Sequence, residues 1–162
     1  MPLIKNGEWA EDDYEAVADD APLPANGALV SLKRFEAERE TLLARNAKLG
    51  VKLASSETPE ALGEDVHRLS LIALDFPVFK DGRGFSWARM LRTRMGYKGE
   101  LRATGGFLVD QLAHLTRVGF DSFDGDARIT PEALKHAQAE ITHPYQPAAD
   151  GKKTIRELRA GV

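Results

Sequence analysis

The segment DFPVFKDGRG (residues 75–84) combines acids, two cations and two glycines directly after the apolar run LSLIAL. Gly82 and Gly84 allow a close approach of the backbone to a ligand. The helix predicted to follow points its free N–H groups and positive dipole end into the loop, which suits phosphate, sulfate or carboxylate. Arg83 adds a bidentate donor and Lys80 a mobile one. We therefore predict an anion site. Its ligand-binding residues in this loop are Asp75, Lys80, Gly82, Arg83, Gly84 and Ser86.

The same loop also has a purely structural interpretation. Asp-Gly is common turn chemistry, and Asp75 then only pairs with Arg83 or caps the helix. Ser86 is either the helix cap or a ligand contact. If the loop belongs to an enzyme, Asp75 and Arg83 are its candidate catalytic residues.

A second loop of the same kind lies in ATGGFLVDQL, where Thr104, Gly105 and Gly106 join a predicted strand to a predicted helix. With GFDSFDG after that helix, the segment resembles the phosphate-binding strand pairs of many (β/α)₈ barrels. An ordinary glycine-built turn is the alternative. Because ligands of α/β proteins bind at the carboxyl ends of the strands, we place both loops on one rim. We add Arg102, Thr104, Gly105 and Gly106 to the predicted ligand-binding residues.

Charge is distributed unevenly along the chain. Residues 1–20 contain seven acids and one lysine, whereas residues 80–102 contain seven bases and two acids. This polarity either steers an anionic ligand or an acidic partner protein, or is satisfied internally. Arg89 and Arg92 share the polar face of a predicted helix, where they form a partner-docking patch or simply solubilise the surface.

The composition excludes several kinds of site. The 162 residues include no cysteine, which excludes disulfides, thiolate-ligated iron–sulfur clusters and thiolate-ligated haem. A flavin remains a possible cofactor. The four histidines show no metal-ligand spacing, so we expect no metal. A net charge of −3 argues against nucleic acid. No membrane-length apolar run or signal peptide is found in the sequence, and we expect a cytoplasmic protein without a membrane partner.

Strand and helix patterns alternate along the chain. Asn6-Gly7 predicts a short N-terminal hairpin. Each predicted strand is followed by a helical pattern, which predicts an α/β fold. We expect a five-stranded, mainly parallel sheet with helices on both faces, flavodoxin-like, or alternatively a half-barrel βα repeat. The chain is then one domain with a hairpin and loop (1–27), a βα core (28–143) and an irregular tail (144–162). The predicted strands are 28–32, 51–55, 69–76, 100–104 and 120–124.

The stretch from Leu74 to Asp124 resembles a bacterial family catalogued as domain-of-unknown-function family 934. The resemblance rests on Asp75-Phe76-Pro77, Asp81-Gly82-Arg83-Gly84, Ser86, Ala88-Arg89, Leu91-Arg92, Gly96-Tyr97, Gly99-Glu100-Leu101-Arg102-Ala103, Asp110-Gln111 and Gly119-Phe120-Asp121. Gly105-Gly106 departs from the single glycine expected there. The resemblance implies an oxidoreductase or an accessory protein of sulfite reduction, and it brings no accepted catalytic residues.

Two functional hypotheses follow. The first is an accessory protein of assimilatory sulfite reduction, with an anion-binding basic rim, that docks on sulfite reductase or another sulfur-assimilation enzyme. Without cysteine, it is not itself the sulfite reductase. The alternative is a small oxidoreductase or other enzyme that binds a phosphate-bearing cofactor or substrate at the rim. The sequence leaves open whether any reaction is catalysed.

Overall fold

Eight strands form one sheet, and six of them run parallel in the order in which they occur along the chain. The structure is a computed structural model and describes residues 3–161. The sheet order is β2-β1-β8-β7-β6-β5-β4-β3, with β1 antiparallel to both of its neighbours. The strands are β1 (Leu3–Lys5), β2 (Glu8–Ala10), β3 (Tyr14–Ala16), β4 (Gly27–Ser31), β5 (Leu49–Leu53), β6 (Leu71–Phe76), β7 (Glu100–Gly105) and β8 (Ser122–Asp124).

The helices lie in the connections from β4 to β8 and in the chain that follows β8. They are α1 (Leu32–Ala37), α2 (Arg39–Leu43), the 3₁₀ helix η1 (Pro59–Arg68), α3 (Arg83–Arg89) with its π-helical continuation η2 (Met90–Arg94), the 3₁₀ turn η3 (Val109–Gln111), α4 (Leu112–Val118), α5 (Pro131–Glu140) and α6 (Ile155–Ala160). Thr58 and Thr130 cap η1 and α5 through their side chains, and each is followed by a proline in the first turn.

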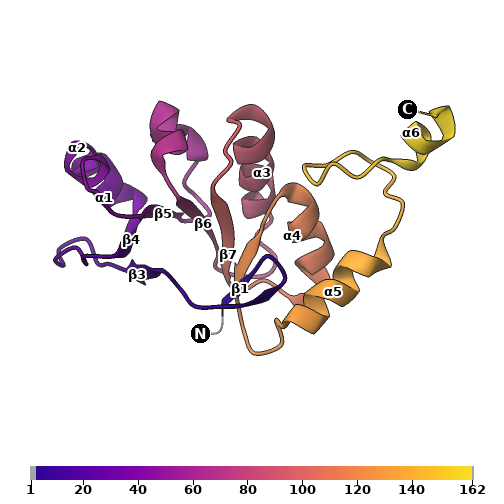
Figure 1. Ribbon diagram of the computed structural model, residues 1–162, viewed down its shortest axis with the longest axis horizontal. Helices are drawn as coiled ribbons and strands as arrows, with labels where there is room; N and C mark the ends of the chain where they lie inside the picture. Colours follow the sequence, from indigo (N-terminus) through magenta and orange to yellow (C-terminus); the bar gives the residue numbers. More distant parts are fainter. Residues whose placement is uncertain (1–2, 162) are drawn as a thin grey trace.

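The helices lie on one face of the sheet, so our prediction of helices on both faces is wrong. In a flavodoxin-like sheet the strand order reverses, which sends the helices to opposite faces. Here each crossover moves one strand further in the same direction, from β3 to β8. Right-handed crossovers then all pass over the same side. Figure 1 shows α1, α3 and α4 along that side. The half-barrel alternative is the correct description.

Alternate residues of each strand point toward the helices and fill the core. Ile72, Leu74 and Phe76 of β6 belong to the buried apolar cluster, as do Leu101 and Ala103 of β7. The intervening residues of both strands face the other, concave side. The polar residues of the central strands therefore converge on the concave side.

A three-residue connection, Glu11–Asp13, forces the sheet to curl. It joins β2 at one edge to β3 at the other. Four Cα–Cα steps reach at most about 14 Å, whereas seven inter-strand spacings in a flat sheet would separate the edges by roughly 33 Å. Figure 1 shows this indigo segment crossing the side opposite the helices. We call residues 11–13 the strap.

The strap is held by Arg102, which lies in the middle of the sheet. The guanidinium makes a bidentate ion pair with Asp12, with Nη1–Oδ2 at 2.7 Å and Nη2–Oδ1 at 3.0 Å. It also donates to Glu100 Oε1 from Nε and Nη2, at 3.1 and 2.8 Å. Lys5 and Ser122 complete the cluster by donating to Glu100 at 2.6 and 2.8 Å. These groups close the end of the curled sheet at which β7 and β8 begin.

Several local expectations are confirmed and others fail. The Asn6-Gly7 hairpin is present, with both residues at positive φ. The predicted sheet lacked β3, whose sequence Tyr-Glu-Ala carries little apolar signal, and it did not include β1 and β2. The tail predicted as irregular contains α6, which Thr154 caps reciprocally with Glu157.

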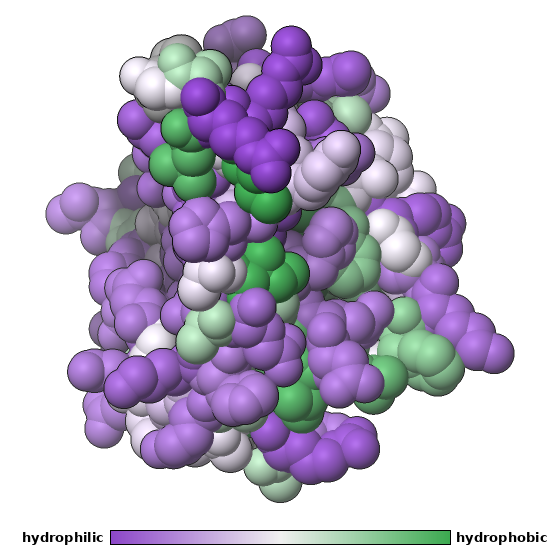
Figure 2. Space-filling model, turned by 90° about the vertical axis from the view of Figure 1, so that its right-hand side faces the viewer, coloured by the Kyte–Doolittle hydropathy of each residue, from purple (hydrophilic) through white to green (hydrophobic). Residues whose placement is uncertain are grey.

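The side of the molecule that carries α5 and α6 is mostly polar. Figure 2 shows hydrophilic side chains over most of this side, with apolar groups between them. None of the helices within residues 3–161 has the length and apolar character needed to cross a membrane.

Replacing Arg102 by Met should lower the free energy of unfolding by about 3 kcal/mol, because Glu100 stays buried with one cation fewer. Urea unfolding at pH 7 measures this change. Asp13→Asn removes an exposed ion pair between the strap and Lys48, at 2.6 Å, and should have little effect. Equal losses in the two variants would contradict the central role of Arg102.

The acid stability of the protein should depend on Glu100. Burial raises the pKa of Glu100, but hydrogen bonds from Lys5, Arg102 and Ser122 outweigh it, so the folded pKa lies below the ordinary value of 4.5. A depressed carboxyl pKa contributes stability that is present above its unfolded value and lost as the pH falls through the folded value. The stability difference between the wild type and Glu100→Gln should therefore shrink below about pH 4.5. Urea midpoints from pH 7 to pH 3 that remain equally spaced would contradict this.

Candidate functional site

In the loop after β6, the position predicted for an anion is taken by the carboxylate of Asp81. Its Oδ1 accepts from the backbone N–H and Nε of Arg83, at 3.2 and 2.9 Å, and Oδ2 accepts from Nη2 at 2.6 Å. Arg83 Nη2 also donates to Ser55 Oγ at 2.9 Å. The hydrogen bonds from Arg83 hold the pKa of Asp81 well below its usual range. Arg83 thus pairs with Asp81 rather than Asp75, and an external anion must compete with Asp81.

Close packing around Phe76 explains two of the loop glycines, Gly84 and Gly105. A Cβ added to Gly84 would lie 2.5 Å from the Phe76 ring, and one added to Gly105 would lie 2.6 Å from the Phe76 carbonyl oxygen. Gly105 also has a φ of 94°, in the left-handed region. The N–H of Gly106 donates to the same carbonyl at 2.6 Å. These contacts fix α3 and the loop after β7 against the end of β6.

The other predicted residues of the first loop are exposed. A Cβ on Gly82 would meet open space, and the Lys80 ammonium lies 5.6 Å from the centroid of the Phe79 ring. Ser86 lies inside α3, which begins at Arg83, so it does not cap the helix.

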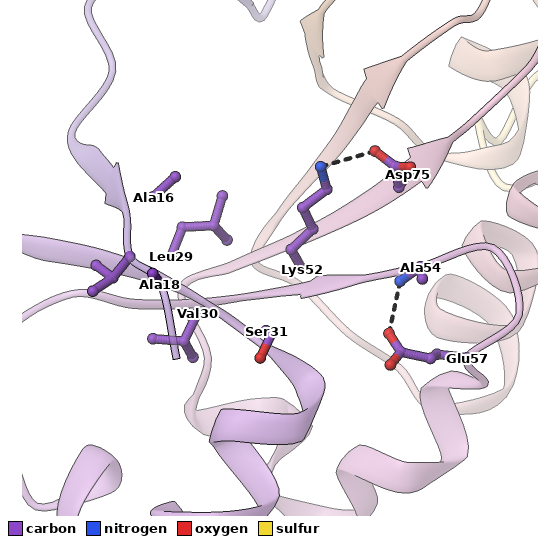
Figure 3. Close-up of a pocket in the computed structure, with 10 residues that line it drawn as sticks. Ala16, Ala18, Leu29, Val30, Ser31, Lys52, Ala54, Glu57 and Asp75 are labelled. Carbon is purple, nitrogen blue, oxygen red and sulfur yellow. Dashed lines mark hydrogen bonds and ion pairs between the residues drawn. The ribbon is translucent and has the colours of Figure 1, made fainter. Parts of the chain in front are cut away.

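Asp75 and Thr104 meet on the concave face near the carboxyl ends of β6 and β7. The two residues are paired in register, and Thr104 Oγ1 donates to Asp75 Oδ1 at 3.1 Å. Lys52 of β5 reaches the same oxygen, with Nζ–Oδ1 at 2.8 Å (Figure 3). Three adjacent strands therefore place a cation, a carboxylate and a hydroxyl side by side.

Sequence reasoning missed Lys52. The signal was a single lysine at position 52 between Val51 and Leu53, both of which belong to the core. An isolated lysine at an alternate position of an otherwise apolar strand points away from the core. Its pairing with Asp75 could not be predicted without the strand order, which brings β5 next to β6.

A cleft of about 430 Å³ opens beside Lys52 and Asp75. Apart from these two, its polar lining residues are Ser31 and Glu57. Both have partners: Ser31 Oγ donates to Asp19 at 2.6 Å, and Glu57 accepts from the backbone N–H of Ala54 at 2.7 Å (Figure 3). The rest of the lining is apolar and consists of Ala16, Val17, Ala18, Leu29, Val30 and Ala54.

Lys52 and Asp75 retain unused hydrogen-bonding capacity toward the cleft. An ammonium group has three donors, and Asp75 is the only ion-pair partner of Lys52 within residues 3–161. Both contacts to Asp75 use Oδ1, and Oδ2 accepts no hydrogen bond from the described part of the chain. The cleft therefore offers donors and an acceptor next to an apolar wall, as small-molecule sites do.

Arg102 does not join this group. Its side chain is 2% exposed, and its guanidinium is bound by Asp12 and Glu100 near the opposite end of the sheet. The structure therefore separates Arg102 from Asp75 and Thr104, although the sequence analysis placed all three on one rim.

Of the two arginines proposed for partner docking, only Arg89 is exposed. Arg92 donates to the carbonyls of Tyr97, Gly99 and Gly119 and pairs with Asp121 at 2.9 Å. It locks η2 to the starts of β7 and β8, so its assignment to a free docking patch is wrong.

No group of three or more histidine, aspartate or glutamate side chains within residues 3–161 is placed to hold a metal ion.

Comparison with curated proteins finds no match to this chain. A family model described as "Bacterial protein of unknown function (DUF934)" matches residues 50–156, a range that includes Lys52, Asp75 and Thr104. The chain belongs to this family.

Proposed function

We propose that this protein binds a small ligand with an anionic group in the cleft beside Lys52, as an accessory of sulfite reduction. The observation that carries this proposal is the Lys52 ammonium, which borders the cleft with donors to spare. Its position near the carboxyl end of β5 supports the assignment, because ligands of barrels and of open α/β sheets bind at that end. The other end is closed by the strap and Arg102.

The setting in sulfur assimilation comes from the family resemblance. The candidate ligands are accordingly sulfite, sulfate and phosphate-bearing compounds, including flavins. A cytoplasmic location belongs to the same proposal. The predicted loop site at Arg83 is the weaker location, because Asp81 already satisfies that guanidinium.

Docking on a sulfur-assimilation enzyme is best supported at the outer face of α3 and η2. Arg89 and Arg94 are exposed there and line a shared groove with Ser86 and Thr93. Neither arginine forms an ion pair within the described residues. Unpaired cations of this kind attract an acidic partner surface.

A small enzyme remains the second candidate, because Asp75 and Lys52 form an adjacent base and acid. Thr104 fixes the orientation of the carboxylate. In this alternative, Asp75 accepts a proton from the bound substrate. Turnover that disappears in Asp75→Asn, while ligand binding persists, would distinguish the enzyme from the accessory.

A ligand of the cleft should raise the melting temperature of the wild type but not of Lys52→Met. A ligand at 100 times its dissociation constant stabilises by about 2.7 kcal/mol, or roughly 5–10 °C for a domain of this size. Thermal melts with sulfite, sulfate, phosphate, FMN, FAD and NADPH measure the shift. Lys48→Met is the matched control, because Lys48 has one aspartate partner but lies outside the cleft. A shift lost in Arg83→Ala but kept in Lys52→Met would move the site to the loop.

Reversing the charge of Arg89 and Arg94 should weaken binding to sulfite reductase. Each substitution to Glu places an acid opposite the acidic partner surface that we propose, and the effect should decrease as salt is added. Affinity measurements at two ionic strengths test this. Lys33→Glu, at an exposed lysine of α1, controls for net charge. Equal effects of both changes would contradict a docking face on α3 and η2.

A further inference from the structure

We propose that the ligand of the cleft is an α-amino acid, an inference that rests on the proposed ligand site beside Lys52. It starts from the composition of that site, which is a cation and a carboxylate in contact. A ligand that contacts both groups meets a cation and an anion side by side. An α-amino acid satisfies both charges, because its carboxylate and its ammonium are attached to the same carbon.

A simple inorganic oxyanion can use Lys52, but it satisfies this pair less fully than a zwitterion does. An anion on Lys52 comes close to Asp75, whose carboxylate is only 2.8 Å from the same ammonium. Like charges at such separations repel, and the partly buried position of Asp75 reduces screening by solvent. Among the residues that the structure describes, no second cation lines the cleft to offset the repulsion.

A zwitterion instead matches the site charge for charge. The ligand carboxylate accepts from the unused donors of Lys52, and the ligand ammonium donates to Asp75 Oδ2, the oxygen left free by Thr104 and Lys52. Both contacts are charge-assisted hydrogen bonds. The total charge of ligand and pair is zero, so binding adds no net charge to the cleft.

The remaining walls indicate the kind of side chain that fits. Ala16, Leu29 and Ala54 belong to an apolar lining, whereas Glu57 and Ser31 are already hydrogen-bonded. Figure 3 shows these groups around the space next to Lys52. A neutral side chain fits the apolar part of the lining, whereas an acidic side chain would also meet the Glu57 carboxylate.

The test begins with thermal melts of the wild-type protein against each of the twenty proteinogenic amino acids. The one that stabilises most is then titrated calorimetrically beside two analogues, the same molecule without its amino group and the same molecule without its carboxylate. We expect the intact amino acid to bind at least ten times more tightly than either analogue.

The variants assign each half of the ligand to its partner. The Lys52→Met variant should bind the amino acid no more tightly than it binds the decarboxylated analogue, because the partner of the ligand carboxylate is gone. The Asp75→Asn variant should likewise bind the amino acid no more tightly than it binds the deaminated analogue. Lys48→Met should leave all three affinities unchanged. Circular dichroism verifies the fold of each variant, and the three-ligand comparison on the wild type does not depend on them.

The outcomes separate this inference from the proposed function. If the deaminated analogue or sulfate binds the wild type as tightly as the amino acid does, and Lys52→Met weakens it, the amino-acid assignment is overturned and the anion site stands. If neither amino acids nor anions bind, both fail.

Discussion

The ion pair between Arg102 and Asp12 is the interaction on which the shape of this protein depends. Eight strands in nearly sequential order would form an open sheet. The strap joins its two edges through three residues, and Arg102 holds it over the concave face. A buried guanidinium needs partners for its donors, and Asp12 and Glu100 supply them. The curvature that brings Lys52 and Asp75 to face a cleft follows from this closure.

The two ends of the curled sheet therefore have different roles. At the end where β7 and β8 start, Lys5, Glu100 and Ser122 satisfy one another and leave little unused capacity. At the other end, Lys52 and Asp75 meet with donors and an acceptor to spare. A parallel sheet places its variable loops at the same end. The polar groups with unused hydrogen-bonding capacity thus lie at the end of the sheet where ligands of α/β proteins bind.

Local patterns predicted most of the elements, but not how they assemble. The five predicted strands exist because their apolar runs are bounded by turn residues, and Asn6-Gly7 forms its hairpin because both residues accept positive φ. The side taken by the helices depends on strand order, which no local pattern encodes. The rule that ligands bind at the carboxyl ends of strands placed Asp75 and Thr104 on one rim, but without the strand order Lys52 was missed and Arg102 was placed with them. Gly84 and Gly105 were interpreted as ligand contacts, yet their closest neighbour is Phe76.

The two proposed surfaces differ in electrostatic character, and this difference separates their roles. The cleft contains Lys52 and Asp75 in contact, with Glu57 further along its lining, and a zwitterionic ligand enters without a change in net charge. Added salt should then have little effect on the affinity for this ligand, because the ligand carries no net charge to be screened. The face of α3 and η2 carries Arg89 and Arg94 without partners in the described chain, and attraction across such a face weakens steeply with ionic strength. Raising the salt concentration would thus release an acidic partner while leaving the cleft occupied. If both proposals hold, the small ligand and the partner bind through independent forces, and neither event needs to displace the other.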